Sequence, residues 1–324
     1  MSNLKIVNKW KIWFAIPAVI MIAGIIMLFV PGMNVGIEFT GGTIMTVTLG
    51  ELADGANYNA SVAKITDIIE KNGGEVSYFQ KSSAEETSKS AIDFRFRVKG
   101  DSTDIVNQIK NDVAAEFGGD AADTSFITSE TIGESASRDL LKNAILGAAI
   151  AIALIMIYVI IRFEFWSGVT AVLALIHDVF IMIALTVIFQ IQVNSSFVAA
   201  VITIIAYSIN NTIVIFDRIR ERIKPIDDKS RIDYAEVADE AINNTLTRTL
   251  FTSATTLITV IFLAILGVPS MREFTLPIIF GLVAGTYSSI FLSTPAWALI
   301  NKAISDRKGN YNRVKGKTKF KKQR

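Results

Sequence analysis

Six long apolar runs divide this sequence, and each is long enough to cross a lipid bilayer, which takes about 20 residues of helix. Hydrophobic residues make up 51% of the chain and its mean hydropathy is +0.44, which is too apolar for one soluble domain. The sequence therefore predicts an integral membrane protein with six transmembrane helices. The predicted helices cover residues 12–30, 144–161, 166–189, 193–216, 249–268 and 274–300.

The first apolar run has 19 residues and ends in Phe29-Val30-Pro31. A signal peptide has a shorter apolar core and a cleavage site with small residues, and neither feature is present here. Residues 1–31 are therefore interpreted as a short tail followed by a retained first transmembrane helix.

Residues 32–137 are polar and show the patterning of a soluble domain between the first and second membrane helices. Ile92, Phe94 and Phe96 alternate with charged residues, as in a half-buried strand. Apolar residues recur at helical spacing elsewhere in the segment. The predicted order is β-α-β-β-α-β, the ferredoxin-like plan. Strands are expected at 44–49, 75–79, 92–98 and 125–131, and helices at 60–71 and 104–117.

The loop charges predict the orientation of the chain, because Lys and Arg gather on the cytoplasmic side of membrane proteins. They occur in the N-terminal tail, near Arg162, in residues 217–248 and in the tail 301–324, whereas the short links on the opposite side, 190–192 and 269–273, hold only Arg272. Both termini are therefore expected in the cytoplasm and residues 32–137 outside it, with 138–300 forming a five-helix bundle. The basic tail is typical of a topology signal that contacts anionic membrane lipid, and it lacks the interleaved aromatic residues of a nucleic-acid module.

The composition excludes several classes of site. There is no cysteine and only one histidine, His177, so disulfides, thiolate metal sites and multi-histidine metal sites are excluded. No catalytic dyad, nucleotide-binding fingerprint or metal-ligand cluster is found in the sequence. The chain is therefore expected to be neither an enzyme nor dependent on a cofactor.

Asp178 is the only acidic residue deep inside a predicted span. An ionised carboxylate at the centre of a membrane helix costs about 2.5–3.5 kcal/mol, so it needs a partner or a proton. One interpretation is a proton or ion site, and the other is a buried acid bonded to hydroxyls or to His177. On a helix His177 points about 100° away from its neighbour, so it is expected to bond to another helix instead.

The fourth run carries polar side chains just before it leaves the membrane at Asp217 and Arg218. An unpaired polar group in hydrocarbon costs several kcal/mol, so neighbouring helices must supply partners. Simple packing of the two adjacent amides is the alternative to an ion pathway. The polar residues are Tyr207, Ser208, Asn210, Asn211 and Thr212.

Arg248 opens the fifth run, and Thr252, Thr255, Thr256 and Thr259 follow it at helical spacing. Hydroxyls on one face are the usual interhelical contacts of membrane helices. Arg248 is either an anchor at the helix end or part of an ion pathway.

Three local motifs resemble the SecF family, the smaller half of the SecD–SecF complex of bacterial protein export. The first is AYSINNTIVIFDRIRE, where Ala206 replaces the usual Gly and Asn211 the usual Asp. The second begins at Leu246 and contains Arg248, and the third contains Gly41-Gly42 with Glu38 in place of the usual Asp. The resemblance covers nearly the whole chain in the same order.

The resemblance implies the six-helix half of the resistance-nodulation-division fold and a role beside SecD. It also implies that the chain assists the translocation of a preprotein through SecYEG, using the ion-motive force through Arg248 and the family's acid. Because Asn211 cannot titrate, Asp178 could carry the proton, sodium could be the coupling ion, or the acid could belong to the partner. The alternatives are a scaffold that holds SecD without moving ions, an exporter of small apolar molecules, and an intramembrane hydrolase.

Overall fold

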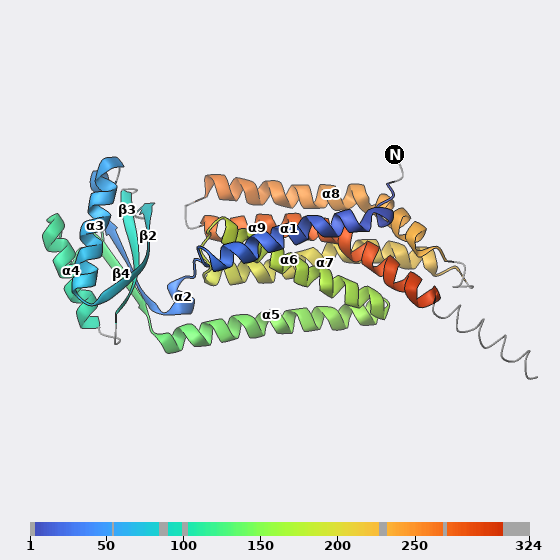
Figure 1. Cartoon of the computed structure of the whole chain (residues 1–324), viewed down its shortest axis with the longest axis horizontal. Coiled ribbons are helices and arrows are strands. Elements are labelled where there is room, and N and C mark those ends of the chain that lie inside the picture. Colours follow the sequence, from blue (N-terminus) through green and yellow to red (C-terminus); the bar gives the residue numbers. More distant parts are fainter. Residues whose placement is uncertain are drawn as a thin grey trace, which may run out of the picture. The chain divides into compact units, whose positions relative to one another are not determined.

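The computed structural model describes residues 4–53, 55–83, 90–98, 103–226, 232–267 and 271–306 (Figure 1). The chain divides into two compact units, one of Met1–Asn34 with Leu146–Arg324 and the other of Val35–Ile145. Most of the predicted basic tail, beyond residue 306, lies outside the described residues.

Six helices within the described residues are long and apolar enough to cross a membrane, which confirms the predicted six-helix fold class. They are α1 (Trp10–Phe29), α5 (Glu134–Arg162), α6 (Phe165–Ile188), α7 (Ser195–Ile223), α8 (Tyr234–Leu266) and a last helical span, Arg272–Asp306, that begins with α9 (Arg272–Ser288).

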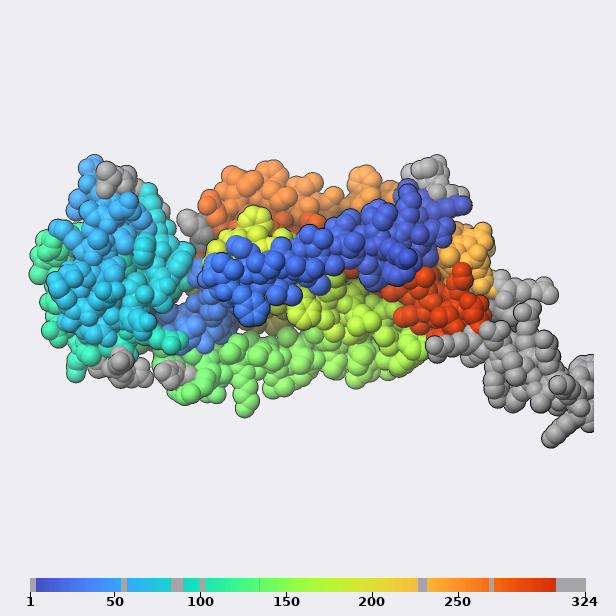
Figure 2. Space-filling view, viewed as in Figure 1, coloured from blue at the N-terminus to red at the C-terminus, as the bar shows by residue number. Residues whose placement is uncertain are grey.

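Helix α9 is the centre of the membrane unit and packs against α6, α7 and α8. Helix α1 packs against α6, where Gly24 lies so close to Ala184 that a Cβ atom at Gly24 would be 2.4 Å from the Ala184 Cβ. Figure 2 shows α1 and α5 at the surface. Large apolar side chains on both helices are exposed, among them Val19 and Leu154. An apolar exterior of this kind suits a hydrocarbon environment.

The link between α7 and α8 is much shorter than residues 217–248, the gap between the fourth and fifth predicted helices. Helix α7 continues to Ile223, and α8 begins at Tyr234 and runs unbroken into the fifth span. Asp233 caps α8 by accepting hydrogen bonds from the backbone N–H groups of Ala235 and Glu236.

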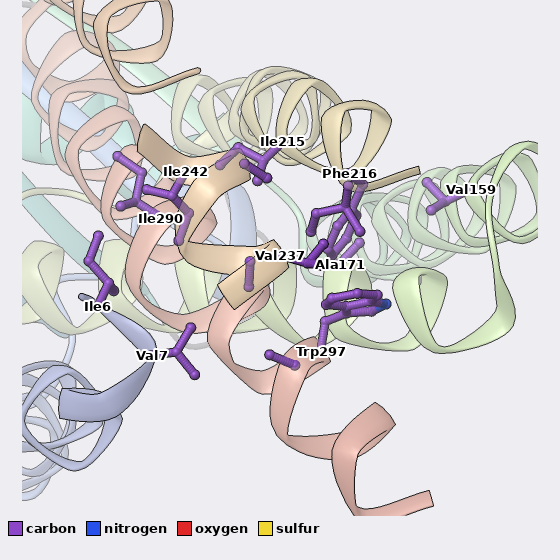
Figure 3. Packing of buried hydrophobic residues seen from close by; sticks show 14 of the residues in the cluster. Ile6, Val7, Val159, Ala171, Ile215, Phe216, Val237, Ile242, Ile290 and Trp297 are labelled. Atoms are coloured by element: carbon purple, nitrogen blue, oxygen red, sulfur yellow. The ribbon is translucent and has the colours of Figure 1, made fainter. Parts of the chain in front are cut away.

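Apolar residues explain why these helix extensions pack together. Ile219 of α7 and Val237 and Ile242 of α8 belong to one buried cluster. Figure 3 shows Phe216, Val237 and Trp297, from three different helices, gathered in this cluster. Burying these side chains stabilises the extensions by about 1.5–3 kcal/mol each.

The second unit has a four-stranded antiparallel sheet with the order β2-β3-β1-β4, the arrangement of the predicted ferredoxin-like plan. The strands are β1 (Gly42–Thr48), β2 (Gly74–Ser83), β3 (Ser90–Val98) and β4 (Ile127–Ile132). Helices α3 (Gly55–Lys71) and α4 (Thr103–Phe117) cover one face of the sheet (Figure 1).

The core of this unit lies between the sheet and its two helices. Met45 and Val47 of β1 and Phe94 of β3 meet Ile65 of α3 and Ile109 of α4, all of them fully buried. The predicted alternation of apolar and polar residues in β3 therefore marks an inner and an outer face.

The two glycines of the third motif follow a short helix, α2 (Ile37–Thr40), that the sequence analysis did not predict. Gly41 and Gly42 have positive φ angles of 71° and 127°, which other residues rarely adopt. A Cβ atom at Gly42 would also lie 2.9 Å from the Phe96 carbonyl oxygen. The motif therefore turns the chain sharply into β1.

Candidate polar site in the membrane unit

Asp178 lies in the middle of α6 and is completely buried. Its Oδ2 accepts hydrogen bonds from Ser208 Oγ of α7 at 2.5 Å and from Ser288 Oγ of α9 at 2.8 Å. Its Oδ1 lies 3.0 Å from His177 Nδ1. Three helices therefore meet at one carboxyl group.

Small residues let α7 and α9 approach closely enough for this arrangement. A Cβ atom at Gly285 of α9 would lie 2.9 Å from both the Cβ and the Oγ of Ser208. One turn earlier, a Cβ atom at Gly281 would lie 2.4 Å from a side-chain carbon of Ile204. The glycines bring the two backbones together, which is the usual role of small residues between membrane helices.

His177 differs from the expectation of a bond to another helix. Its Nδ1 lies 3.0 Å from Oδ1 of Asp178, the next residue on the same helix. Its Nε2 is buried and has no hydrogen-bond partner in the described part of the chain.

Asn211 lies three residues beyond Ser208 on α7 and forms a second polar cluster. Its Nδ2 donates to Ser253 Oγ of α8 at 3.1 Å, and Thr286 Oγ1 of α9 donates to the same oxygen at 2.8 Å. Asn211 is 3% exposed, and the hydrogen-bond partner of its amide is the Ser253 hydroxyl.

The neighbouring polar residues of α7 also find partners on other helices. Thr212 Oγ1 lies 2.8 Å from Ser289 Oγ, and Tyr207 donates its hydroxyl hydrogen to Thr256 Oγ1 of α8 at 3.0 Å. The requirement that neighbouring helices satisfy this stretch is therefore met at Tyr207, Ser208, Asn211 and Thr212.

The remaining predicted residues lie elsewhere. Asn210 and Arg248 are exposed in this chain, and Arg248 is not among the groups bonded to Asp178. At the end of α7, Asp217 pairs with Arg162 at 3.1 Å and Arg218 pairs with Glu221 at 2.9 Å. Exposed pairs of this kind contribute little stability.

Sequence reasoning missed four hydroxyls that complete the site, because Ser and Thr are common contacts in every membrane helix. These four differ from the other Ser and Thr hydroxyls in lying opposite the polar stretch of α7, and that position is known only from the three-dimensional structure. They are Ser253, Thr286, Ser288 and Ser289. The described residues contain no group of three or more His, Cys, Asp or Glu that could hold a metal ion.

Comparison with known proteins gives the family of this chain. Residues 112–303 match the family described as protein export membrane protein SecD/SecF, C-terminal, and residues 26–50 match the SecD/SecF GG motif. The chain belongs to the SecD/SecF family. Its relatives are named protein translocase subunits, which supports the expectation that the chain is not an enzyme.

Two bacterial relatives match the SecD/SecF-family chain over most of their length. The protein translocase subunit SecF of Sebaldella termitidis is 33% identical over 93% of this chain and 92% of its own length. The SecF of Helicobacter pylori strain J99 is 34% identical over 88% of this chain and 83% of its own length. The chain is therefore a multi-pass membrane protein of a bacterial family.

A solved structure confirms the fold at the level of the backbone. The crystal structure of SecDF from Thermus thermophilus, a translocon-associated membrane protein, is 29% identical with a TM-score of 0.73. It matches 90% of this chain, whereas the chain spans only 37% of that protein. SecDF therefore contains a large additional region beyond the part that resembles this chain.

Proposed function

We propose that this chain assists Sec protein export together with SecD, and that Asp178 couples its conformation to the ion-motive force. The relatives named protein translocase subunit SecF support the export role. The SecDF protein, in which a matching region is part of a longer chain, supports SecD as the partner. SecYEG and the translocating preprotein follow as the further partners of such a complex.

The observation that carries the coupling proposal is the set of contacts around Asp178. Its carboxylate is completely buried and joins α6, α7 and α9 through two serine hydroxyls. Adding or removing a proton there changes the bonds that hold three helices together. Moving one charge across a potential of 100 mV releases roughly 2.3 kcal/mol, which is enough to bias two helix arrangements.

Asn211 stands where the family usually has an Asp, and this supports Asp178 as the group that exchanges the ion. The Asn211 amide donates to Ser253 and cannot gain or lose a proton. Asp178 is then the titratable carboxylate of this chain that lies deepest in the bundle. An acid supplied by SecD, or sodium as the coupling ion, is the competing explanation.

A polar stripe on α7 and α8 supports an interface with SecD. Asn210, Arg248, Thr252, Thr255 and Thr259 are all exposed in the isolated chain. Polar groups facing lipid are costly, so a partner helix that covers them would lower the free energy of the complex. In this proposal both termini are cytoplasmic and the ferredoxin-like unit lies outside the cytoplasm.

The test is gradient-dependent preprotein translocation in inverted membrane vesicles at matched protein levels. Asp178→Asn is expected to abolish the part of translocation that depends on the ion gradient and to leave co-purification with SecD intact. Asp306→Asn, at the exposed end of the last helix, is the matched control and should behave as the unchanged protein. Full gradient-dependent translocation with Asp178→Asn would instead favour the scaffold function, which the amide at Asn211 makes a serious competitor.

A further inference from the structure

The last membrane helix contains one turn with a different hydrogen-bonding pattern. Helix α9 ends at Ser288, a π-helical turn covers Ser289–Ser293, and the helical span continues to Asp306. Single π-turns inside α-helices are rare and occur frequently at functional sites. This turn begins directly after Ser288, which donates its hydroxyl hydrogen to Asp178.

Ser288, just before the turn, and Ser289, its first residue, are held by different helices. Ser288 contacts Asp178 of α6 at 2.8 Å. Ser289 donates to the Gly285 carbonyl oxygen at 2.7 Å, so its contact with Thr212 of α7 at 2.8 Å must have Thr212 as the donor. The position of the turn therefore depends on both α6 and α7.

The hydroxyls of Ser293 and Thr294, at the end of the turn, indicate that the backbone of the turn can adopt a second conformation. Thr294 Oγ1 donates to the Ser289 carbonyl oxygen at 2.9 Å, five residues back, which is the π-helical spacing. Ser293 Oγ is buried and has no partner within the described residues. In an α-helix, a serine hydroxyl commonly donates to the backbone carbonyl oxygen four residues earlier, which for Ser293 is the carbonyl of Ser289. The unpaired hydroxyl would thus gain its partner in the α-helical form.

We propose that the turn Ser289–Ser293 switches between a π-helix and an α-helix, and that the protonation state of Asp178 sets the balance. This inference rests on the proposed function, because it takes Asp178 as the group that exchanges the ion. A proton on Oδ2 would compete with the hydroxyls of Ser208 and Ser288 for the lone pairs of that oxygen. Losing the bond to Ser288 releases the residue that precedes the π-turn.

Two hydroxyls and one imidazole surround the Asp178 carboxyl group. Among the described residues, the groups bonded to Asp178 are His177 from its own helix, Ser208 from α7 and Ser288 from α9. Helices α7 and α9 therefore bring hydroxyls and no charge into contact with it. Helix α1, which also packs on α6, meets it closely at Gly24.

The switch would move the end of the last helix. Absorbing the extra residue of the π-turn turns the following segment by about 100° and lengthens the helix by about 1.5 Å. That segment carries Trp297, whose ring centroid lies 6.5 Å from Phe216 and 5.8 Å from Tyr234. A change at Asp178 would therefore be transmitted to the ends of α7 and α8 that meet Trp297.

The experiment measures a distance across this part of the full-length protein in lipid nanodiscs. Because the chain has no cysteine, spin labels can be placed with Lys224→Cys, just beyond α7, and Lys302→Cys, beyond the turn. Pulsed electron paramagnetic resonance then reports the distance between the labels. A turn of about 100° moves a side chain at a radius of about 5 Å by up to about 8 Å.

Asp178→Asn and Thr294→Val are each expected to shift the distance distribution. Thr294→Ser, which keeps the hydroxyl, should retain the original distance, and Ser293→Ala added to Asp178→Asn should restore it. Thr275→Val is the control, since Thr275 is equally buried on the same helix and its hydroxyl donates to the Met271 carbonyl oxygen.

Unchanged distances with both Asp178→Asn and Thr294→Val, in protein that remains folded and monodisperse, would overturn the switch. If Asp178→Asn then still lacked gradient-dependent translocation, the proposed function would stand without the switch. Shifted distances combined with full translocation would instead remove the ion-coupling function and leave the conformational change.

Discussion

Two buried polar residues of the membrane unit, Asp178 and Asn211, differ in their ability to exchange a proton. Ser208 and Ser288 hold Asp178 from two other helices, whereas Asn211 occupies a neighbouring cluster of neutral hydroxyls. An amide and a carboxylate have almost the same shape but differ in the ability to exchange a proton. The separation of the two clusters therefore assigns proton exchange to Asp178 in the proposed mechanism.

Substituting Asn211→Asp tests that assignment. The new carboxylate would lie beside Ser253 and would be a second group able to bind a proton or sodium. We expect translocation to be retained and its dependence on pH or sodium to shift, measured in vesicles across both variables. Asn210→Asp on the exposed face is the control, and an identical dependence in the Asn211→Asp protein would contradict the prediction.

Gly285 is the residue on which the geometry of Asp178 depends most directly. The Cβ atom added by Gly285→Ala would be 2.9 Å from Ser208 and would push α7 away from α9. Overpacking of this kind costs about 1–3 kcal/mol, so the melting temperature of the purified protein should fall. Gly147→Ala on α5, where a Cβ atom meets nothing within 4 Å, should leave it unchanged or raise it.

At the scale of elements, the N-terminal segment is fastened to α8 through backbone hydrogen bonds. The N–H groups of Ile6 and Val7 donate to Asp239 Oδ1 at 2.9 and 3.0 Å, and Asn243 bonds to the backbone of Leu4. Ile6 and Val7 are buried in the cluster that also contains Val237 (Figure 3). The start of α1 is therefore held by a helix far away in the sequence.

Asp239→Ala should release this segment. Two partly buried N–H groups would lose their acceptor, which costs about 1–3 kcal/mol. Hydrogen–deuterium exchange of the peptide containing Ile6 and Val7 should accelerate, while exchange in α9 stays the same. Asp239→Asn retains an acceptor oxygen and should exchange more slowly than Asp239→Ala. Equal exchange in Asp239→Ala and the unchanged protein would show that apolar burial alone holds the segment.

At the scale of the whole molecule, a membrane unit and a ferredoxin-like unit are built with different periodicities. Long apolar runs produce the membrane helices, and alternating strands with two amphipathic helices produce a separate core. Each unit buries its own apolar residues.

The predicted orientation can be tested with single cysteines, since none has to be removed first. Thr124→Cys in the ferredoxin-like unit and Lys224→Cys beyond α7 are both at exposed positions. A membrane-impermeant maleimide should label Thr124→Cys in intact cells and should label Lys224→Cys only after the membrane is permeabilised. The reverse pattern would contradict the loop-charge prediction.

The six membrane helices, the order of the ferredoxin-like elements and the need for partners around Ser208 and Asn211 could all be predicted from the sequence. These features follow from local periodicity and from the cost of polar groups in hydrocarbon. The three-dimensional packing was needed to show which hydroxyls meet Asp178, that His177 lies against Asp178, and that Asn210 and Arg248 lie outside these contacts. Ser and Thr occur several times on each of α6, α7, α8 and α9, and the close packing of α7 on α9 at Gly285 selects Ser208 and Ser288.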